Sequence, residues 1–530
     1  MMRIRSVQLP AFAALALLVS MIVLSQDFGA TWDERFQQKY GERVWDYLHG
    51  RRDLSEFAPA PGNEYLYGGG VEVLAVAVQR VFPRADVFVL RHRIVSVFGW
   101  AGIVFAGLLA ARLFGARAGW LAALLLALAP RYFGDAMNNS KDIPFAAAAI
   151  ATIYYTLTIR ADPPYVTWAH AAKLATAITV AINIRPLGLM LLTYSASVIL
   201  ATSLVRALGD GRREAWRTFG VTTMTIAAVA LAAIAAGTFA WPWAQAHPLA
   251  RPLEAFSFVS RLDWAREFPT LYRGQWTAAS DLPWHYVLVW IGIGLPPVVL
   301  VGLALSPLIA WRDDARRAAV AALAAFVIAP VIAAIVQHAT LYDGIRHLTF
   351  VIPPLVVLSA IGWIAAIDRV RQRLRALAVA ALVVGAAEPF IFAVRNHPNQ
   401  TVYFSPLAGG PRAAFTRYEM DYWGNSMLQA LEFAAALAER SHAAIVVSGN
   451  PLEIVQADAT RFRSLAVVPR SRRTYQLDIR LLRGPADSIR EFVSRGDVVH
   501  TIRTADGTPL CIVLPGPAYE TLQRQLARFE

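Results

Sequence analysis

The chain has 530 residues, of which 56% are hydrophobic and only 16% are charged, and its mean hydropathy is +0.44. This composition excludes a disordered or collagen-like protein and argues against a soluble enzyme, because the apolar residues come in runs near the length of a membrane-crossing helix. The net charge of +13 is split between clusters that apolar runs separate, which argues against a nucleic-acid-binding face, and the lone Cys511 excludes an intrachain disulfide.

Apolar runs recur along residues 1–394 and predict an all-α membrane domain, a polytopic bundle of about 11 transmembrane helices. The first run follows the basic start Met1 to Arg5 and is too long for the core of a signal peptide, so we expect an uncleaved span. The predicted spans cover residues 8–25, 94–113, 119–134, 143–160, 171–185, 187–205, 219–240, 285–310, 318–337, 346–366 and 376–394.

Arginine clusters occupy three of the short gaps between predicted spans, at 212–217, 312–317 and 369–375. Cytoplasmic loops are enriched in Lys and Arg, so these gaps are predicted to be cytoplasmic, with the N-terminus inside and the C-terminus outside. The remaining long gaps are then outer loops, and they hold most of the loop carboxylates, aromatic residues and histidines. These outer loops cover about 26–93, 135–142, 241–284 and 338–345.

Residues 395–530 lack long apolar runs and alternate a helical pattern with short apolar strands. This pattern predicts a small extracytoplasmic α/β domain. The last two expected strands would form a hairpin around Asp506-Gly507. The expected helices cover 426–440 and 487–494, and the expected strands cover 443–448, 464–468, 498–503 and 509–514.

The first outer loop begins Thr31-Trp32-Asp33-Glu34, in which Thr31 and Glu34 have the spacing of a helix capping box. The segment that follows predicts an amphipathic helix on the outer membrane surface. Asp33 and Glu34 would lie just outside the bilayer, where they either carry chemistry or only favour the helix dipole. The apolar residues of this helix recur at four-residue steps, at Phe36, Tyr40, Val44 and Leu48.

A second outer turn places Asp135, Lys141 and Asp142 close together between two apolar runs. These residues could form part of a site, although a capped helix start before Pro144 explains Asp142 without any chemistry. Arg185 lies inside an apolar run, where a charge is costly. It is either functional or snorkels to the outer interface.

The segment from His338 to His347 joins the ninth and tenth predicted spans. Two histidines with Asp343 between them could bind a metal, but their spacing is not that of a specific helical metal site. Arg346 is better suited to a phosphate diester at the membrane surface, because its planar guanidinium offers five donors in a fixed geometry.

Four features together make the chain resemble the GT-C class of integral-membrane glycosyltransferases. The chain is most similar to the protein O-mannosyltransferases and the lipid A aminoarabinose transferase, and thus resembles bacterial glycosyltransferase family 39. The resemblance covers about residues 8–394, and its most specific element is the early Asp-Glu pair. The features are Asp33-Glu34 after the first span, Asp142-Ile143-Pro144 at the start of the fourth, Pro283-Trp284-His285-Tyr286 before a late span, and Arg346-His347 ahead of Pro353-Pro354.

The resemblance implies an inverting enzyme that transfers a hexose or pentose from a polyprenyl-phosphate donor to a hydroxyl of an extracytoplasmic lipid, glycan or protein. It implies a bacterial cytoplasmic (inner) membrane location, with the active site facing the periplasm. No cofactor is implied, and a divalent metal is the alternative. Carried over by position, Asp33 is the catalytic carboxylate, Glu34, Asp135 and Asp142 are acceptor-site or supporting residues, and Arg346, Lys141, Arg185 and His347 bind the donor phosphate.

The chemistry of such a transfer fits carboxylates in outer loops. A lipid-linked donor presents its anomeric carbon at the membrane surface, and its phosphate leaves as a stable anion, so one carboxylate suffices as a base. A transporter or lipid-carrier flippase stays open as an alternative, and it predicts ionisable residues near the middle of the membrane. A periplasmic scaffold on an inactive membrane anchor is a third interpretation.

Overall fold

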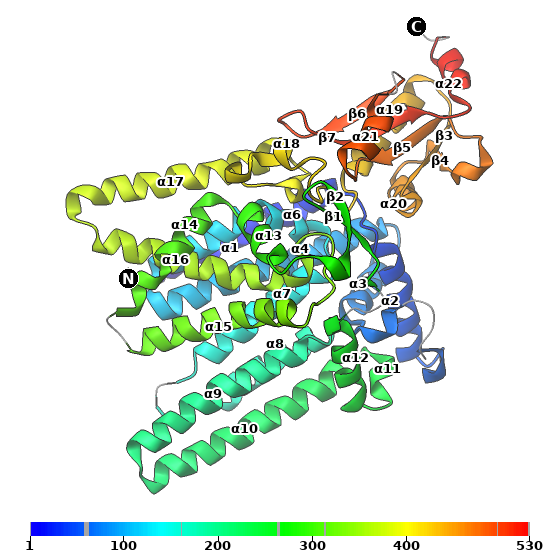
Figure 1. Cartoon of the computed structure of the whole chain (residues 1–530). Helices are drawn as coiled ribbons and strands as arrows, with labels where there is room; N and C mark the ends of the chain where they lie inside the picture. The colour runs from blue at the N-terminus through cyan, green and yellow to red at the C-terminus, as the bar shows by residue number, and fades with distance from the viewer. Residues whose placement is uncertain are drawn as a thin grey trace.

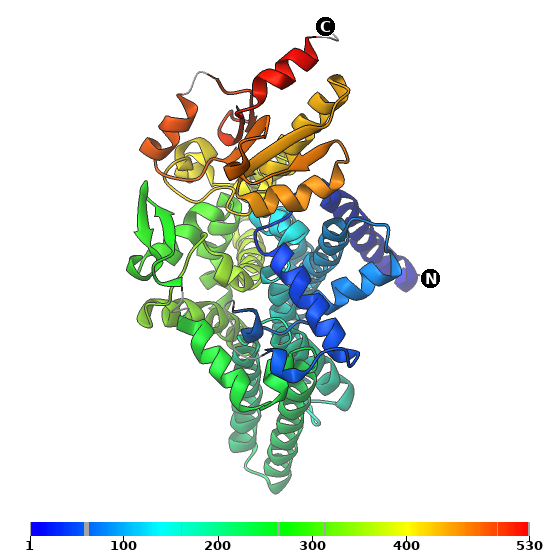
Figure 2. The ribbon, with the colours of Figure 1, turned by 90° about the vertical axis from the view of Figure 1, so that its right-hand side faces the viewer.

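The computed structural model describes residues 2–57, 63–160, 162–261, 265–311, 314–494 and 497–527. Long helices form the larger part of the molecule, and a smaller α/β part, which contains the last residues described, packs on one end of them (Figures 1 and 2). The turns that join α9 to α10 and α16 to α17 lie at the opposite end (Figure 1). The molecule therefore has a helical body that carries the α/β part at one end and turns between long helices at the other.

The helices of the body follow the apolar runs of the sequence. The first turn of α4 is held by Asp86, whose carboxylate accepts hydrogen bonds from the backbone N–H groups of Phe88 and Val89 at 2.9 and 3.0 Å. These helices are α1 (Met2–Leu24), α4 (Val87–Phe114), α5 (Ala116–Ala127), α7 (Asp142–Leu157), α8 (Trp168–Ile182), α9 (Gly188–Asp210), α10 (Arg213–Gly237), α13 (Tyr286–Gly294), α14 (Pro297–Leu305), α15 (Asp314–Val336), α16 (Ile352–Arg369) and α17 (Gln372–Arg395).

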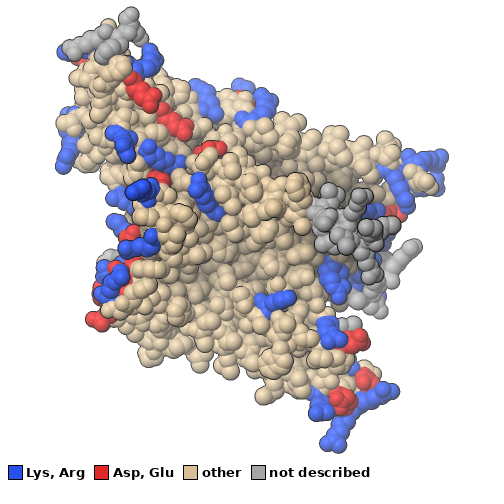
Figure 3. Space-filling view, turned by 180° about the vertical axis from the view of Figure 1, so that it is seen from behind, with Lys and Arg blue, Asp and Glu red and all other residues tan. Residues whose placement is uncertain are grey.

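Within the described ranges, six helices are long and apolar enough to cross a membrane, or seven if the bent pair α13–α14 is one span. Shorter apolar helices account for the predicted spans at α1, α5, α7 and α8. The chain is thus a multi-pass membrane protein, whereas the predicted count of about 11 spans is not confirmed. Charged side chains are sparse over the middle of the body and gather toward its ends (Figure 3).

Prolines interrupt two of the predicted spans. The span predicted at 119–134 ends as a helix at Ala127, and a separate helix, α6 (Pro130–Asn138), begins at Pro130. The span predicted at 285–310 bends by 114° between α13 and α14, where Pro296 and Pro297 follow each other. Proline has no backbone N–H and disfavours helix at the preceding residue, so a run of apolar residues alone overestimates helix length at both places.

Short elements cover the end of the body that carries the α/β part. Helix α2 packs on α3 with a largely polar buried face that includes Glu34, Gln37 and Gln38. On the predicted apolar face, Tyr40 and Val44 are buried and Phe36 is half exposed. The elements are α2 (Glu34–Leu48), α3 (Gly70–Val81), α11 (Pro242–Gln245), α12 (Ala250–Arg261), β1 (Pro269–Tyr272), β2 (Gln275–Ala278) and α18 (Gly410–Ala414).

The α/β part contains a five-stranded sheet of order β4-β3-β5-β7-β6. Strand β3 is parallel to β4 and β5, and β7 is antiparallel to β5 and β6. The predicted helix at 426–440 and the β6–β7 hairpin are present, whereas β5, α20 and α22 were not predicted. The elements are α19 (Ser426–Arg440), β3 (Ile445–Asn450), α20 (Leu452–Asp458), β4 (Leu465–Val467), β5 (Leu477–Leu481), α21 (Ala486–Val493), β6 (His500–Arg503), β7 (Pro509–Pro515) and α22 (Tyr519–Leu526).

The α/β part holds the chain segment that leads from α1 into α2. The side-chain oxygen of Asn425 accepts a hydrogen bond from the backbone N–H of Gly29, and Asp458 accepts one from Ala30, at 2.9 and 2.8 Å. Arg461 donates to the carbonyl oxygen of Phe28 at 2.9 Å. Burial raises the pKa of Asp458 to about 7, against the lowering effect of Arg461. These contacts fix the backbone a few residues before Asp33.

Candidate active site

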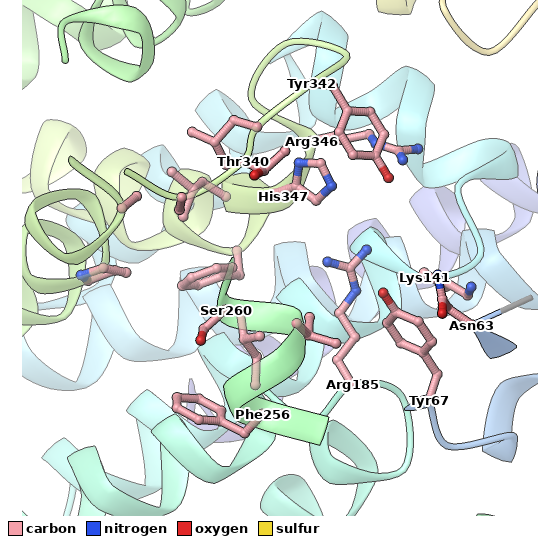
Figure 4. Close-up of a pocket in the computed structure, with 18 of the residues that line it drawn as sticks. Asn63, Tyr67, Lys141, Arg185, Phe256, Ser260, Thr340, Tyr342, Arg346 and His347 are labelled. Atoms are coloured by element: carbon pink, nitrogen blue, oxygen red, sulfur yellow. The ribbon is translucent and has the colours of Figure 1, made fainter. Parts of the chain in front are cut away.

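A cavity of about 570 Å³ lies at the α/β end of the body, next to the N-terminus of α2. Arg185 points across it toward Arg346 and His347, with Tyr67 and Lys141 on one side and Phe256 and Ser260 on another (Figure 4). Polar and charged side chains line one part of the cavity, and apolar ones line the rest. The lining residues are Asp33, Phe36, Gln37, Asn63, Glu64, Tyr67, Lys141, Arg185, Leu187, Met190, Phe256, Val259, Ser260, Pro330, Ala333, Ala334, Gln337, Ala339, Thr340, Leu341, Tyr342, Arg346, His347, Leu348 and Phe350.

Asp33 brings a carboxylate to this cavity. It directly precedes α2, and its side chain makes no capping hydrogen bond to the helix. The capping function falls to its neighbour, because Glu34 accepts a hydrogen bond from the backbone N–H of Thr31 at 2.8 Å, which is half of the predicted capping box. The carboxylate of Asp33 is 40% exposed and lies 3.9 Å from Nη1 of Arg346. It is therefore free to meet a ligand.

Arg346 is supported on several sides but is not fully bonded. Its Nε lies 3.7 Å from Oδ2 of Asp343, and its guanidinium carbon lies 4.5 Å from the ring centre of Tyr342 and 5.0 Å from that of Trp423. The side chain is 11% exposed, yet its Nε has no hydrogen-bond partner among the described residues. Arg346 thus presents unused donors to the cavity.

Arg185 lines the same cavity but is already paired. It donates to Oδ1 of Asp142, whose Oδ2 accepts a hydrogen bond from the amide of Asn139 at 2.8 Å. The turn before α9 that carries Arg185 is packed tightly, since a Cβ on Gly68 would come within 2.1 Å of the carbonyl oxygen of Asn183. Asp142 itself is buried and outside the cavity lining. The predicted carboxylate Asp142 therefore fixes Arg185 and does not face the cavity.

Lys141 and His347 complete the basic lining. The ammonium of Lys141 lies 4.5 Å from the ring centre of Tyr67, and burial raises the pKa of the Tyr67 hydroxyl. The ring of His347 packs edge-on against Tyr342 at 4.6 Å, and its Nδ1 has no partner among the described residues. Both residues therefore line the same cavity as Arg346.

Two predicted acidic residues lie elsewhere. Glu34 is fully buried against α4, with one carboxylate oxygen 3.1 Å from Nε2 of His92. Asp135 is buried and accepts a hydrogen bond from Nε1 of Trp423 at 3.0 Å. Burial raises the pKa of Asp135 to about 7. Neither residue lines the cavity, and of the two roles expected for them, acceptor-site or supporting, the geometry favours the supporting one.

Gln37 is a cavity residue that the sequence did not reveal. Its side-chain oxygen accepts hydrogen bonds from Nη2 of Arg91 at 2.9 Å and from the hydroxyl of Ser140. Since arginine can only donate, the amide oxygen must face Arg91, which leaves the amide N–H groups for a ligand. Its position one helical turn after Asp33 was the available signal, but an uncharged Gln in a polar helix does not stand out.

The site has no evident metal centre. Within the described ranges, no three side chains of His, Cys, Asp or Glu are grouped so that they could hold a metal ion. The cavity combines cations with the exposed carboxylate of Asp33, and Glu64 also lines it. Such a site can bind an anion next to a group that accepts a proton.

No protein-family profile matches the chain, and neither does any curated protein. ArnT from Cupriavidus metallidurans bound to undecaprenyl phosphate is a similar solved structure, at 12% identity and a TM-score of 0.48, over 95% of this chain and 97% of that one. The archaeal oligosaccharyltransferase AglB from Archaeoglobus fulgidus, in complex with an inhibitory peptide and a dolichol-phosphate, is 14% identical with a TM-score of 0.46. That match covers 81% of this chain and 58% of AglB.

ArnT is the lipid A aminoarabinose transferase, and both neighbours are GT-C glycosyltransferases, the class that the sequence resembles. At TM-scores of 0.48 and 0.46 these similarities assign no role to any residue and no substrate to this chain. The functional conclusion therefore depends on the cavity and its chemistry.

Proposed function

We propose that the chain is an inverting glycosyltransferase that moves a sugar from a polyprenyl-phosphate donor to a hydroxyl group of an acceptor outside the membrane. The observation that carries this proposal is one cavity in which the Asp33 carboxylate faces the cations Arg346 and Lys141. The transfer needs a proton acceptor and a phosphate-binding group in one cavity, and here the Asp33 carboxylate lies 3.9 Å from Nη1 of Arg346. The volume of about 570 Å³ accommodates such a ligand.

The reaction proceeds in one displacement. The acceptor oxygen forms a bond to the anomeric carbon while its proton passes to Asp33. The bond between the anomeric carbon and the phosphate oxygen breaks, and its electron pair leaves with the phosphate. Arg346 stabilises the added negative charge, since its side chain lines the cavity and its nearest carboxylate oxygens lie at 3.7 and 3.9 Å, beyond hydrogen-bonding distance. A single displacement inverts the configuration at the anomeric carbon.

The apolar part of the lining supports a lipid-linked donor. Leu187 and Met190, at the start of α9, and Pro330 and Ala333, on α15, line the same cavity as Arg346. A cationic end next to an apolar wall between two membrane helices matches a phosphate attached to a prenyl chain. A water-soluble nucleotide-sugar donor would gain nothing from this wall.

Gln37 and His347 are the remaining polar groups suited to the sugar. The amide N–H groups of Gln37, held away from Arg91, can donate to a sugar or acceptor hydroxyl close to Asp33. His347 lies beside Arg346 in the sequence and in the cavity (Figure 4). These contacts would orient the anomeric carbon between the base and the leaving group.

We place the site on the periplasmic face of a bacterial cytoplasmic membrane. The exposed arginine clusters at 212–217 and 369–375 lie at the end of the body opposite the cavity (Figure 1), and cytoplasmic turns are the ones enriched in arginine. A reporter that is active only in the periplasm should work when fused to the end of the chain. Activity of a cytoplasm-only reporter at that position would contradict this orientation.

The direct test is a transfer assay with the purified protein in nanodiscs. A synthetic polyprenyl-phosphate sugar should be consumed, polyprenyl phosphate should be released in equal amount, and mass spectrometry should find the sugar on an acceptor from an envelope extract. A flippase would instead move a labelled donor lipid across the bilayer of a liposome without breaking it. That outcome would replace the proposed function.

A further inference from the structure

Arg483 is a side chain of the α/β part that reaches toward the cavity region. Arg483 lies two residues after β5, and its side chain is 18% exposed. Its Nε donates to Oε2 of Glu419 at 2.6 Å, and its Nη2 donates to Oδ1 of Asp343 at 2.5 Å. Arg483 therefore connects the sheet of the α/β part to the loop that precedes Arg346.

The loop that Arg483 holds has an unusual backbone. Asp343 has φ +55° and Gly344 has φ +74°, so two consecutive residues are in the left-handed region. The hydroxyl of Tyr286 fixes the next peptide, since it accepts from the N–H of Gly344 at 3.1 Å. The backbone conformation thus sets the direction of the Asp343 side chain, and the hydrogen bond from Arg483 fixes its carboxylate.

The two oxygens of Asp343 face two different arginines. Oδ1 is bonded to Arg483 at 2.5 Å, whereas Oδ2 stays 3.7 Å from Nε of Arg346, beyond hydrogen-bonding distance. Without Arg483, Arg346 would be the remaining cation paired with this buried carboxylate among the described residues. The carboxylate would then take the donors of Arg346 for itself, because a buried charge without a partner is costly.

We propose that Arg483 is a positioning residue that keeps Arg346 available for the donor phosphate by holding Asp343 away from it. This inference rests on the proposed function, in which Arg346 binds that phosphate. Arg483 is absent from the cavity lining and so acts through Asp343. The α/β part thereby contributes to donor binding without touching the donor, in addition to holding the segment before Asp33.

The test measures the affinity of purified protein in nanodiscs for a polyprenyl phosphate that carries no sugar. Arg483→Met should weaken binding about tenfold, within the range of coupling between residues that share a charged network. The KM for the acceptor should stay unchanged. The affinity of Arg483→Lys for polyprenyl phosphate should lie between those of the wild type and Arg483→Met. Lysine keeps the charge near Glu419 but lacks the planar fork that reaches both carboxylates. If the Met variant does not fold, the Lys variant alone decides, and wild-type affinity in it overturns the inference.

The matched control is Arg480→Met. Arg480 is on β5, is 14% exposed and pairs with Asp478 rather than with Asp343. The Arg480→Met substitution therefore removes a similar arginine from the same region and leaves Asp343 unaffected. This variant should bind polyprenyl phosphate as the wild type does. Equal weakening in the Arg480 and Arg483 variants would show a general loss of the α/β part and would overturn the inference.

A double variant separates this inference from the proposed function. If Arg483 acts only through Arg346, then Arg346→Met/Arg483→Met should bind no more weakly than Arg346→Met alone. Additive losses would overturn the inference and leave the donor site in place. Normal binding by Arg346→Met would instead remove Arg346 from the donor site, and the proposed phosphate site would fail together with the inference.

Discussion

The two arginines that meet across the cavity are held in different ways. Arg185 donates directly to Asp142, and Asn139 fixes that carboxylate in turn. Arg346 has carboxylate oxygens at 3.7 and 3.9 Å and stacks near two aromatic rings, while the Nε of both arginines lacks a partner among the described residues. An arginine that donates to a buried carboxylate stabilises the fold, whereas one whose nearest carboxylates lie beyond hydrogen-bonding distance is available to an anion.

The carboxylates show the same contrast. Asp142 and Glu34 are buried and bonded to basic side chains, while Asp33 is 40% exposed and only loosely paired. One side of the cavity is therefore a bonded structural network, and the other side carries the loosely paired carboxylate of Asp33 and the guanidinium of Arg346. The chemistry should depend on the second side and the stability on the first.

The largest effect is expected from Asp33→Asn. Asparagine keeps the size of the side chain but cannot take a proton, so transfer should fall by about 10²–10⁴-fold, the usual contribution of a positioned base. Donor binding and Tm should change little, because the Asp33 side chain makes no capping bond. The measurement is sugar transfer from a synthetic polyprenyl-phosphate donor.

Glu34→Gln is the matched control for Asp33→Asn, since it changes the adjacent carboxylate in the same way. Glu34 is buried and bonded to Thr31 and His92, so this variant should lose stability and keep most of its transfer rate per folded molecule. The reverse order of effects would assign the base to Glu34.

The next effect is expected at Arg346. Arg346→Lys keeps the positive charge but loses the planar fork and its stacking on Tyr342 and Trp423, so donor affinity should fall about tenfold, as for one lost charge-assisted hydrogen bond. The measurement is the KM for the lipid donor. Wild-type donor affinity in the Lys variant would remove Arg346 from the phosphate site.

Arg185→Met should act mainly on stability. It leaves the buried carboxylate of Asp142 without its partner, which costs about 3 kcal/mol or more for a buried pair. Thermal unfolding in nanodiscs should show a lower Tm than the wild type, with a smaller change in donor KM than Arg346→Lys causes. Pairing the variant with Asp142→Asn should recover part of the Tm. A stable Arg185→Met variant that no longer binds the donor would instead show that Arg185 acts in donor binding and not in stability.

The smallest effect is a dependence of stability on pH at the joint between the body and the α/β part. Burial raises the pKa of Asp458 to about 7 from a usual value of 3.8. The raised pKa means that folding favours the protonated form of Asp458. The stabilisation of the folded state by this group is therefore full below about pH 4 and is lost as the pH rises toward 7. Tm should be higher at pH 5.5 than at pH 8.

Asp458→Asn should reduce this pH dependence, because Asn can still accept the hydrogen bond from Ala30 but does not titrate. Glu453→Gln, at an exposed position of the same helix α20, is the control and should keep the pH dependence of the wild type. An unchanged pH profile in Asp458→Asn would assign the dependence to another group.

The sequence predicted the parts of this structure that depend on local pattern. Helix α19 has the predicted bounds, and the apolar runs mark the helices of the body, because periodicity and run length report local burial. Helix breaks at Pro130 and Pro296 were missed, although proline is a local signal. Asp33 and Arg346 were predicted for one site, and the structure places them 3.9 Å apart. Their roles stay predictions.

The remaining site residues depend on contacts between distant parts of the chain. Trp423 stacks near Arg346, Arg91 orients Gln37, and Arg483 reaches Asp343. A hydrophobic pattern shows which side of an element is buried but not which partner it meets, so none of these pairs could be read from the sequence. The same limit applies to Glu34 and Asp135, which were predicted as acceptor-site or supporting residues and which the structure buries outside the cavity lining.

The configuration of the product at the anomeric carbon tests the one-step mechanism most directly. A donor of known configuration, incubated with the purified protein and an accepted hydroxyl compound, yields a glycoside whose configuration NMR spectroscopy determines from the anomeric proton coupling. With Asp33 as the base and a phosphate that leaves as an anion, the product of a single displacement should have the inverted configuration. A product with retained configuration would require a covalent intermediate and a second displacement, and it would contradict the role of Asp33 as a base.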